Sequence, residues 1–275
     1  MKHIKKINEG WFKSMLNGGK NSRIREKINT REIDSICRKY RIQNYTINPD
    51  ESIDVDGDVN LSSRGLKRIP LKFRNVRGYF YCNYNQLTSL EGCPQSVGGA
   101  FSCSGNQLTS LEGCPQSVGG DFLCYENQLT SLEGCPQNVG GGGGFYCNYN
   151  QLTSLEGCPQ SVGGSFYCNN NKLTSLEGCP QIVGGSFHFN NNKLTDFNGF
   201  PEYWTGLITS NGNPVQKILD RFKSDQPTWC EVIHLLNEMD VIRGTDIIEQ
   251  RFEEVYYRMN LEIPKNLEVE GYNLI

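Results

Sequence analysis

Cysteine is the residue type with the most varied possible chemistry in this chain, which contains 12 of them. Ten recur at a nearly constant interval in two series, which are Cys82, Cys103, Cys124, Cys147 and Cys168, and Cys93, Cys114, Cys135, Cys158 and Cys179. Thiols that recur in this way could pair as disulfides or hold a metal ion. Zinc sites usually contain a C-x-x-C pair, whereas no two cysteines here are closer than ten residues. The spacing therefore argues against a metal site.

Burial as a small apolar side chain is the third interpretation of these cysteines, and we favour it. In the last copy of the repeat, Phe189 and Phe200 stand where the two cysteines are expected. An apolar slot tolerates that exchange, whereas a metal site does not. We therefore predict buried and reduced thiols, no metal and no cofactor. Reduced thiols also favour a cytoplasmic location.

Acidic residues form two further patterns. Asp54-Val-Asp56-Gly-Asp58 suggests a calcium loop, but an EF-hand needs glycine and glutamate at positions that are Val59 and Gly65 here. We interpret this segment as a turn. A row of glutamates recurs with the cysteines, at Glu91, Glu112, Glu133, Glu156 and Glu177. We favour a solvated edge for this row, with a stripe for cations or a basic partner as the alternative.

Groups suited to acid–base catalysis are scarce. The three histidines are His3, His188 and His234, and no acid–base set is visible around them. His234 falls on an apolar helix face, where packing explains it. We predict that the protein is not an enzyme, with an activity in the C-terminal helices as a remote alternative.

The net charge of −3 hides a gradient along the chain. Residues 1–50 contain 12 Lys and Arg against 5 Asp and Glu, whereas residues 80–200 contain 2 against 8. The basic start could contact nucleic acid or an acidic partner, but no basic stripe continues into the repeats. We therefore do not expect nucleic-acid binding. No run of 18 apolar residues is present, so we expect no membrane span.

A sequence repeat predicts the strands and turns that position these residues. The block Leu-Thr-Ser-Leu-Glu-Gly-Cys-Pro-Gln occurs five times at 21-residue intervals, except for one step of 23 at Gly140–Gly144. The alternation Phe101-Ser-Cys103 predicts a strand with one buried face. Extension of the frame in both directions predicts eight strands, which begin at Val59, Phe80, Phe101, Phe122, Phe145, Phe166, Phe187 and Ile208.

The rest of each unit returns the chain to the next strand. An asparagine such as Asn106 follows each strand, and we expect it to accept a hydrogen bond from one turn and donate to the next. Pro115 begins an extended back segment without a helical pattern. The Gly-Gly pair of each unit is expected to provide positive φ angles where the chain bends into the next strand.

The pattern Phe-x-Cys-x-x-Asn-x-Leu-x-x-Leu resembles the core of the leucine-rich repeat, with Phe and Cys at the two strand leucines. The resemblance covers residues 59–215. Asn-Gln-Leu-Thr-Ser-Leu is similar to short repeats of secreted bacterial effectors, and Glu-Gly-Cys-Pro with Val-Gly-Gly is more similar to repeat proteins of tailed phages, most of which have no assigned function. Effector ligases of this kind carry a C-x-D motif, whereas Glu-Val follows Cys230. The resemblance implies a phage-linked origin, with the host cytoplasm as the location if the chain is viral, whereas the departure at Cys230 argues against ligase activity.

The implied fold is an α/β leucine-rich-repeat solenoid that is mostly β, with a concave parallel sheet of about eight short strands, a non-helical convex side, and helical caps at both ends. We expect a helix from Thr30 to Tyr40, a hairpin around Asn-Pro-Asp-Glu-Ser, and C-terminal helices over 215–223, 227–239 and 245–258. The predicted segments are a mobile leader (1–22), a helix and hairpin cap (23–58), the solenoid (59–215) and a C-terminal helical cap (216–275).

Binding is predicted on the concave sheet, at residues that alternate with the core. These are Tyr79, Tyr81, Asn83, Asp121, Tyr125, Tyr146, Asn148, Tyr167, Asn169, His188 and Asn190, with Ser102, Ser104 and Leu123 between them. Tyrosine and asparagine on a rigid surface make good contacts at low entropic cost, although tyrosine is also simply a good strand former. We predict a protein-binding scaffold with a protein partner. The alternative is a structural, virion-associated spacer.

Overall fold

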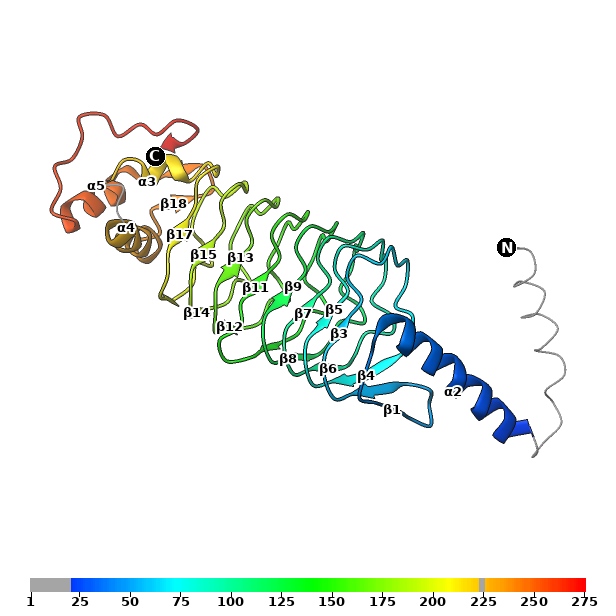
Figure 1. Ribbon diagram of the computed structural model, residues 1–275. Coiled ribbons are helices and arrows are strands. Elements are labelled where there is room, and N and C mark those ends of the chain that lie inside the picture. Colours follow the sequence, from blue (N-terminus) through cyan, green and yellow to red (C-terminus); the bar gives the residue numbers. More distant parts are fainter. Residues whose placement is uncertain (1–20, 223–225) are drawn as a thin grey trace.

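The computed structural model describes the backbone of residues 21–222 and 226–275, and the side chains of residues 29–222 and 229–275. From Val59 the chain winds into a parallel, mostly β solenoid, with a few helices at its two ends (Figure 1). The 21-residue interval reappears as strand register, since Phe80 pairs with Phe101 and Phe101 with Phe122. The predicted solenoid is therefore confirmed.

One long side of the solenoid is an eight-stranded parallel sheet, which we call the main sheet. Its strands begin at the eight predicted residues because an inward apolar side chain starts each one and is buried. The phenylalanine rings from Phe80 to Phe187 follow one another with centroids 5.0–5.8 Å apart. The strands are β3 (Val59–Asn60), β5 (Phe80–Tyr81), β7 (Phe101–Ser102), β9 (Phe122–Leu123), β11 (Phe145–Tyr146), β13 (Phe166–Tyr167), β15 (Phe187–His188) and β17 (Ile208–Thr209).

The opposite long side also holds short strands and no helix within the described solenoid, as predicted. One sheet there contains β1 (Tyr45–Ile47), β2 (Ile53–Val55), β4 (Phe73–Val76), β6 (Ser96–Val97), β8 (Ser117–Val118) and β10 (Asn138–Val139). A second contains β12 (Ser161–Val162), β14 (Ile182–Val183) and β16 (Tyr203–Trp204). The expected hairpin is the antiparallel pair of β1 and β2.

The two sheets of this side are separated at Gly140–Gly144, where the repeat is two residues longer than elsewhere. On the main sheet the pairing continues without a break, because Phe122 of β9 still pairs with Phe145 of β11. The extra residues therefore interrupt only one side of the solenoid.

Apolar side chains fill the space between the two sides, and all ten repeat cysteines are buried, as predicted. They are free cysteines. Asparagine links the turns. Asn106 donates from Nδ2 to the carbonyl oxygens of Cys82 (3.1 Å) and Cys103 (2.9 Å), and its Oδ1 accepts from Leu87 N (3.0 Å). The side chain therefore accepts from the preceding turn and donates to its own, as expected. It also donates to the preceding turn, because its amide nitrogen lies between the two carbonyl oxygens.

The Gly-Gly pairs do not supply positive φ angles, so that prediction is wrong. Gly119 and Gly120 lie outside the left-handed region, and the left-handed glycine is the one before the cysteine, such as Gly113 at φ 83°. Space explains the pairs instead. A Cβ on Gly119 would lie 2.0 Å from the carbonyl oxygen of Gly98 in the preceding turn.

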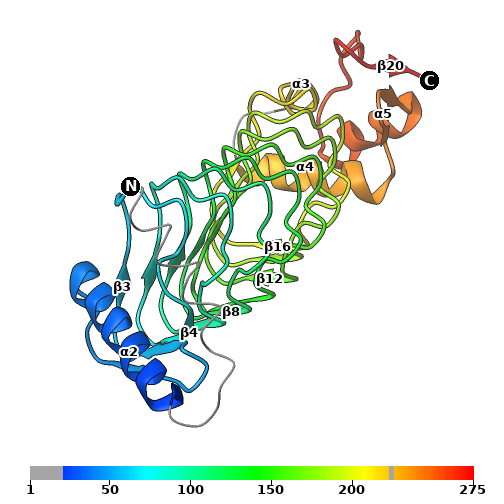
Figure 2. The same cartoon turned by 90° about the vertical axis from the view of Figure 1, so that its right-hand side faces the viewer.

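Helices lie at opposite ends of the solenoid (Figures 1 and 2). At the N-terminal end, α2 spans Asn21–Tyr40, so the helix begins earlier than the predicted Thr30. Ile33 and Cys37 of α2 are buried in the core. The predicted mobile leader over 1–22 lies outside the described residues, apart from Asn21 and Ser22, which belong to α2.

The C-terminal end contains α3 (Gln216–Leu219), α4 (Gln226–Glu238) and α5 (Glu249–Arg258), with a small sheet of β18 (Ile242–Arg243), β19 (Asp246–Ile247) and β20 (Asn273–Leu274). The helix predicted over 245–258 therefore begins later, because Gly244 at φ 62° allows a tight turn that pairs β18 with β19. This segment is bonded to the last turns, since Tyr272 Oη donates to the carbonyl oxygen of Thr195 at 2.7 Å.

Candidate binding surface

The eleven predicted contact residues lie together on the outward side of the main sheet and the turns that follow its strands, and we call this surface the Tyr/Asn face. Tyr81, Tyr146, Tyr167 and His188 share one row, because each pairs in register along the sheet. All eleven side chains are partly buried and none is fully exposed. The second row, two positions later, is Asn83, Tyr125, Asn148, Asn169 and Asn190, and Tyr79 and Asp121 lie two positions earlier.

Aromatic side chains on this face stack on one another. The ring centroids of Tyr146 and Tyr167 are 5.0 Å apart, and those of Tyr167 and His188 are 4.1 Å apart. Tyr79 and Tyr81 stack at 4.3 Å. Neighbouring rings therefore occupy much of each ring face, and the stack offers ring edges and their polar atoms. Burial raises the pKa of Tyr81 and of Tyr146, so both phenols remain hydrogen-bond donors at neutral pH.

Small residues occupy the middle of the face, at β7. Ser102 and Ser104 point outward with the tyrosines but are only 6% and 0% exposed. Tyr84 extends over this turn, because a Cβ on Gly105 would lie 2.4 Å from its ring and its Oη lies 3.1 Å from Tyr125 Oη. That hydrogen bond is the main reason why the pKa of Tyr125 rises to about 12. The middle of the face is therefore a closed surface rather than a cleft.

Asp121 has a structural partner on the face. Its Oδ1 accepts a hydrogen bond from Gly144 N at 2.7 Å. Equivalent side chains do the same, since Asp58 accepts from Tyr79 N at 3.0 Å. Asp121 therefore fixes the turn that follows it. After burial, its negative charge also contributes to the raised pKa of Tyr81 and of Tyr146.

The amides of the second row differ in their hydrogen bonding. Asn83 Oδ1 accepts from Ser62 Oγ at 2.6 Å, whereas the Oδ1 atoms of Asn148 and Asn169 are buried without a partner among the described residues. A buried acceptor without a donor costs about 1–3 kcal/mol. The two unpaired oxygens lie in the turns that carry Tyr146 and Tyr167.

A hydrogen-bonded chain fixes the tautomer of His188. Thr209 Oγ1 donates its proton to Asn190 Oδ1 (3.0 Å), so its oxygen accepts from His188 Nδ1 (2.8 Å). The proton on Nδ1 leaves Nε2 as an acceptor. Burial lowers the pKa of His188, which favours this neutral form at neutral pH.

Three residues of this region were missed by reasoning from the sequence. Tyr84 and Tyr149 are 49% and 53% exposed, more than any predicted contact residue. Each lies three residues after the end of its strand, and the period-two pattern of outward residues excludes that position. Thr209 pairs in register with His188. The extension of the repeat frame to a strand at Ile208 could have predicted its place on the face.

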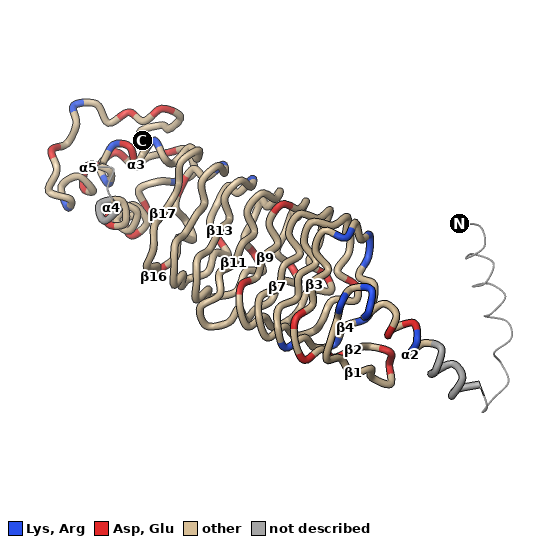
Figure 3. The backbone as a smooth tube through the Cα atoms, viewed as in Figure 1, with Lys and Arg blue, Asp and Glu red and all other residues tan. Residues whose placement is uncertain are grey.

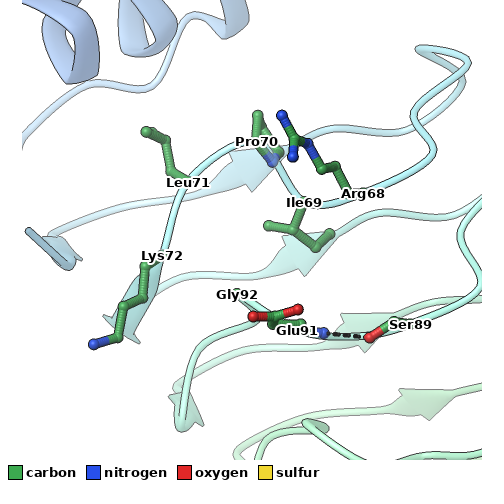
Figure 4. A pocket seen from close by; sticks show the side chains of 8 residues that line it. All are labelled: Arg68, Ile69, Pro70, Leu71, Lys72, Ser89, Glu91 and Gly92. Carbon is green, nitrogen blue, oxygen red and sulfur yellow. Dashed lines mark hydrogen bonds between the residues drawn. The ribbon is translucent and has the colours of Figure 1, made fainter. Parts of the chain in front are cut away.

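A cavity of about 450 Å³ lies elsewhere, between the first turns of the solenoid (Figure 4). Lys72 is paired with Asp50 at 2.8 Å, and Ser89 Oγ accepts from Glu91 N at 3.1 Å. Figure 4 shows Arg68 and Lys72 directed to different sides, so their charges do not converge on one ligand position. No predicted contact residue lines the cavity, whose lining is Arg68, Ile69, Pro70, Leu71, Lys72, Ser89, Glu91 and Gly92.

Among the described residues, no group of three or more His, Cys, Asp or Glu is placed to hold a metal ion. In the calcium-like segment, Asp54 pairs with Arg74 and Asp56 with Arg77, so these carboxylates join neighbouring turns. No helix in the described part of the chain is long and apolar enough to cross a membrane.

Comparisons of the chain with protein-family models, with curated proteins and with solved structures found no match. What bears on its function is therefore the geometry of the chain itself.

Proposed function

We propose that this protein is a scaffold that binds another protein through the Tyr/Asn face and does not transform it. The observation that carries the proposal is the stack of Tyr146, Tyr167 and His188, held in register on a parallel sheet. Aromatic side chains that are already ordered lose little freedom on binding and contribute strongly to protein interfaces. The phenol hydroxyls and His188 Nε2 supply hydrogen-bonding groups at the edge of the stack.

The proposal includes a leucine-rich-repeat type of solenoid with helical caps. The repeat pattern and the inter-turn hydrogen bonds of Asn106 support the first part. For the caps, the support is that α2 buries Ile33 and Cys37, and that Tyr272 bonds to the turn at Thr195. A solenoid must cover the two ends of its core.

Origin and location are also proposals. The resemblance of the Glu-Gly-Cys-Pro repeats to phage proteins supports a phage-linked origin. The buried, free cysteines support a reducing, cytoplasmic environment. The absence of Lys and Arg between residues 78 and 171 supports a protein partner rather than nucleic acid.

An affinity pull-down from host lysate tests the proposed function. The wild-type chain is compared with a variant in which Tyr81, Tyr146, Tyr167 and His188 are all alanine. A matched control, Tyr203→Ala with Tyr257→Ala, removes tyrosines that are 57% and 75% exposed outside the face. Circular dichroism establishes that each variant is folded. We expect wild type and control to retain a partner that the four-site variant loses, and equal recovery by all three would contradict the proposal.

A structural spacer, such as a virion component, is the second candidate. It is favoured by the way the residues of the face cover one another, with Ser102 and Ser104 closed off from solvent. A spacer makes its contacts at its ends. It therefore predicts that the four-site variant keeps every partner, that deletion of 216–275 removes them, and that the protein is found in purified virions.

A further inference from the structure

Another row of side chains runs beside the Tyr/Asn face, at the turn position three residues after the end of each strand of the main sheet and, from Tyr84 on, directly before the repeated asparagine. Every residue in it has a left-handed backbone, with φ between 53° and 76°. We call it the left-handed row. Its members are Ser63, Tyr84, Gly105, Glu126, Tyr149, Asn170, Asn191 and Gly212.

Glycine and asparagine tolerate this conformation best, and they occupy half of the row. Tyr84, Glu126 and Tyr149 adopt it at a cost in stability. The turn itself does not require them, because Asn170 N donates to the next turn at 3.0 Å just as Tyr149 N does at 3.1 Å. Backbone strain that persists where a better residue is available points to a functional position.

The strained tyrosines are accessible. Tyr84 lies against Gly105 and is 49% exposed, and Tyr149 is 53% exposed. Glu126, one turn before Tyr149, is also exposed. The row therefore presents two accessible aromatic side chains with a carboxylate between them.

The turns around these residues carry only negative charge. Residues 78–171 contain six acidic residues and no Lys, Arg or His, so Glu126 has no cation on its own or neighbouring turns. In Figure 3, Lys and Arg gather near β4 and α2. The turns that follow, as far as β13, contain no Lys or Arg. Aromatic rings attract cationic groups, and carboxylates bind them in charge-assisted hydrogen bonds.

We propose that Tyr84, Glu126 and Tyr149 form a contact strip for the arginine or lysine side chains of a basic polypeptide segment. The strip rests on the proposed protein-binding function and adds to it the charge of the partner. It also adds the residues that select that charge, all of which lie outside the eleven predicted contact residues.

Fluorescence anisotropy of the full chain with a labelled peptide of alternating Arg and Gly tests the proposal, with a peptide of alternating Glu and Gly as the counterpart. The test variant combines Glu126→Gln with Tyr149→Asn, which places in this turn the residue that Asn170 provides in the next. The matched control combines Glu202→Gln with Tyr203→Asn, an exposed pair on the opposite long side. We expect the test variant to bind the basic peptide about tenfold more weakly than wild type or control. Its midpoint of urea unfolding should be unchanged or higher, because asparagine relieves the strain.

Several outcomes overturn the strip. They are equal affinity of wild type and test variant, equal binding of the two peptides, no binding of the basic peptide, and a lowered urea midpoint, which would mean that the residues serve the fold. Binding that appears only after deletion of residues 1–20 assigns the strip to the chain's own basic segment instead. If the four-site variant loses its pull-down partner while the strip variant keeps it, the proposed scaffold function is supported and the proposed contact strip is rejected.

Discussion

The repeated asparagine joins each turn to the one before it through a single side chain. Asn127 accepts from Leu108 N at 3.0 Å and donates to the carbonyl oxygens of Cys103 and Cys124 at 3.1 Å, and it is buried. Only a planar amide offers an acceptor and two donors in so small a volume. The joint therefore depends on asparagine even where the strand cysteine is replaced, as at Phe189, whose carbonyl oxygen accepts from Asn192 Nδ2.

Replacement of Asn127 by alanine should be among the most damaging single changes in the solenoid. It leaves one backbone N–H and two carbonyl oxygens without this partner in a buried position, and each such group costs about 1–3 kcal/mol. We expect the free energy of unfolding to fall by about 3 kcal/mol or more, measured by urea unfolding. Gln128→Ala, at the exposed neighbouring position, should change it by less than about 0.5 kcal/mol. A decrease in the free energy of unfolding of less than about 1 kcal/mol for Asn127→Ala would contradict the claim that this side chain links successive turns.

At the scale of the elements, glycine decides how closely successive turns approach. A Cβ at Gly119 would meet the carbonyl oxygen of Gly98 at 2.0 Å, and one at Gly140 would meet that of Gly119 at the same distance. At Gly141, inside the insertion, a Cβ meets nothing within 4 Å. The paired glycines thus set the spacing of the turns on one corner, while the added glycines of the insertion are free of that constraint.

Two alanine substitutions separate these roles. Gly119→Ala should destabilise the chain by about 2 kcal/mol or more, because backbone must move to make room. Gly141→Ala should be neutral or stabilise it by up to about 1 kcal/mol through the unfolded chain. Thermal unfolding followed by circular dichroism measures both. Equal shifts in Tm for the two variants would show that close approach of the turns is not what the glycine pair provides.

The period alone was enough to predict the main sheet, because an inward Phe in each unit begins every strand from β5 to β15. The glycine pairs show what the period could not predict. The same Gly-Gly serves equally for a left-handed bend and for close packing, and only the distance to Gly98 separates the two. On the proposed binding surface, alternation predicted outward side chains at Tyr146 and Tyr167, whereas the exposed Tyr84 and Tyr149 lie on left-handed turn residues that alternation does not cover.

For the whole molecule, charge is arranged differently at the start and in the middle of the solenoid. Three of the six basic residues of the first turn are paired with carboxylates in or beside the hairpin of β1 and β2, as in Lys72 with Asp50 at 2.8 Å and Arg77 with Asp56 at 3.4 Å. Such exposed pairs contribute little stability each, but they compensate the basic side chains nearest the hairpin. The middle turns have carboxylates without Lys, Arg or His, which is where the proposed contact strip for a basic partner lies.

The two cysteine series couple the stability of the whole solenoid to alkaline pH. Burial raises the pKa of Cys135 to about 12 and the pKa of Cys103, Cys124 and Cys147 well above the ordinary value of 9.0. These thiols stay protonated in the folded chain at a pH at which the unfolded chain loses its protons. Their contribution to stability is therefore complete below about pH 9 and is lost as the pH rises from there toward 12.

We therefore expect the free energy of unfolding to fall steeply above pH 9, with each buried thiol contributing a slope of up to about 1.4 kcal/mol per pH unit. Urea unfolding at a series of pH values from 7 to 11 measures it. Tyrosine and lysine titrate in the same window, so the slope of wild type is compared with that of a Cys124→Ala and Cys147→Ala variant. The double variant should be less stable at pH 7 because of the cavities, yet its stability should decline less steeply with pH. Identical slopes would mean that the thiols ionise within the folded solenoid, which contradicts the burial that holds its turns together.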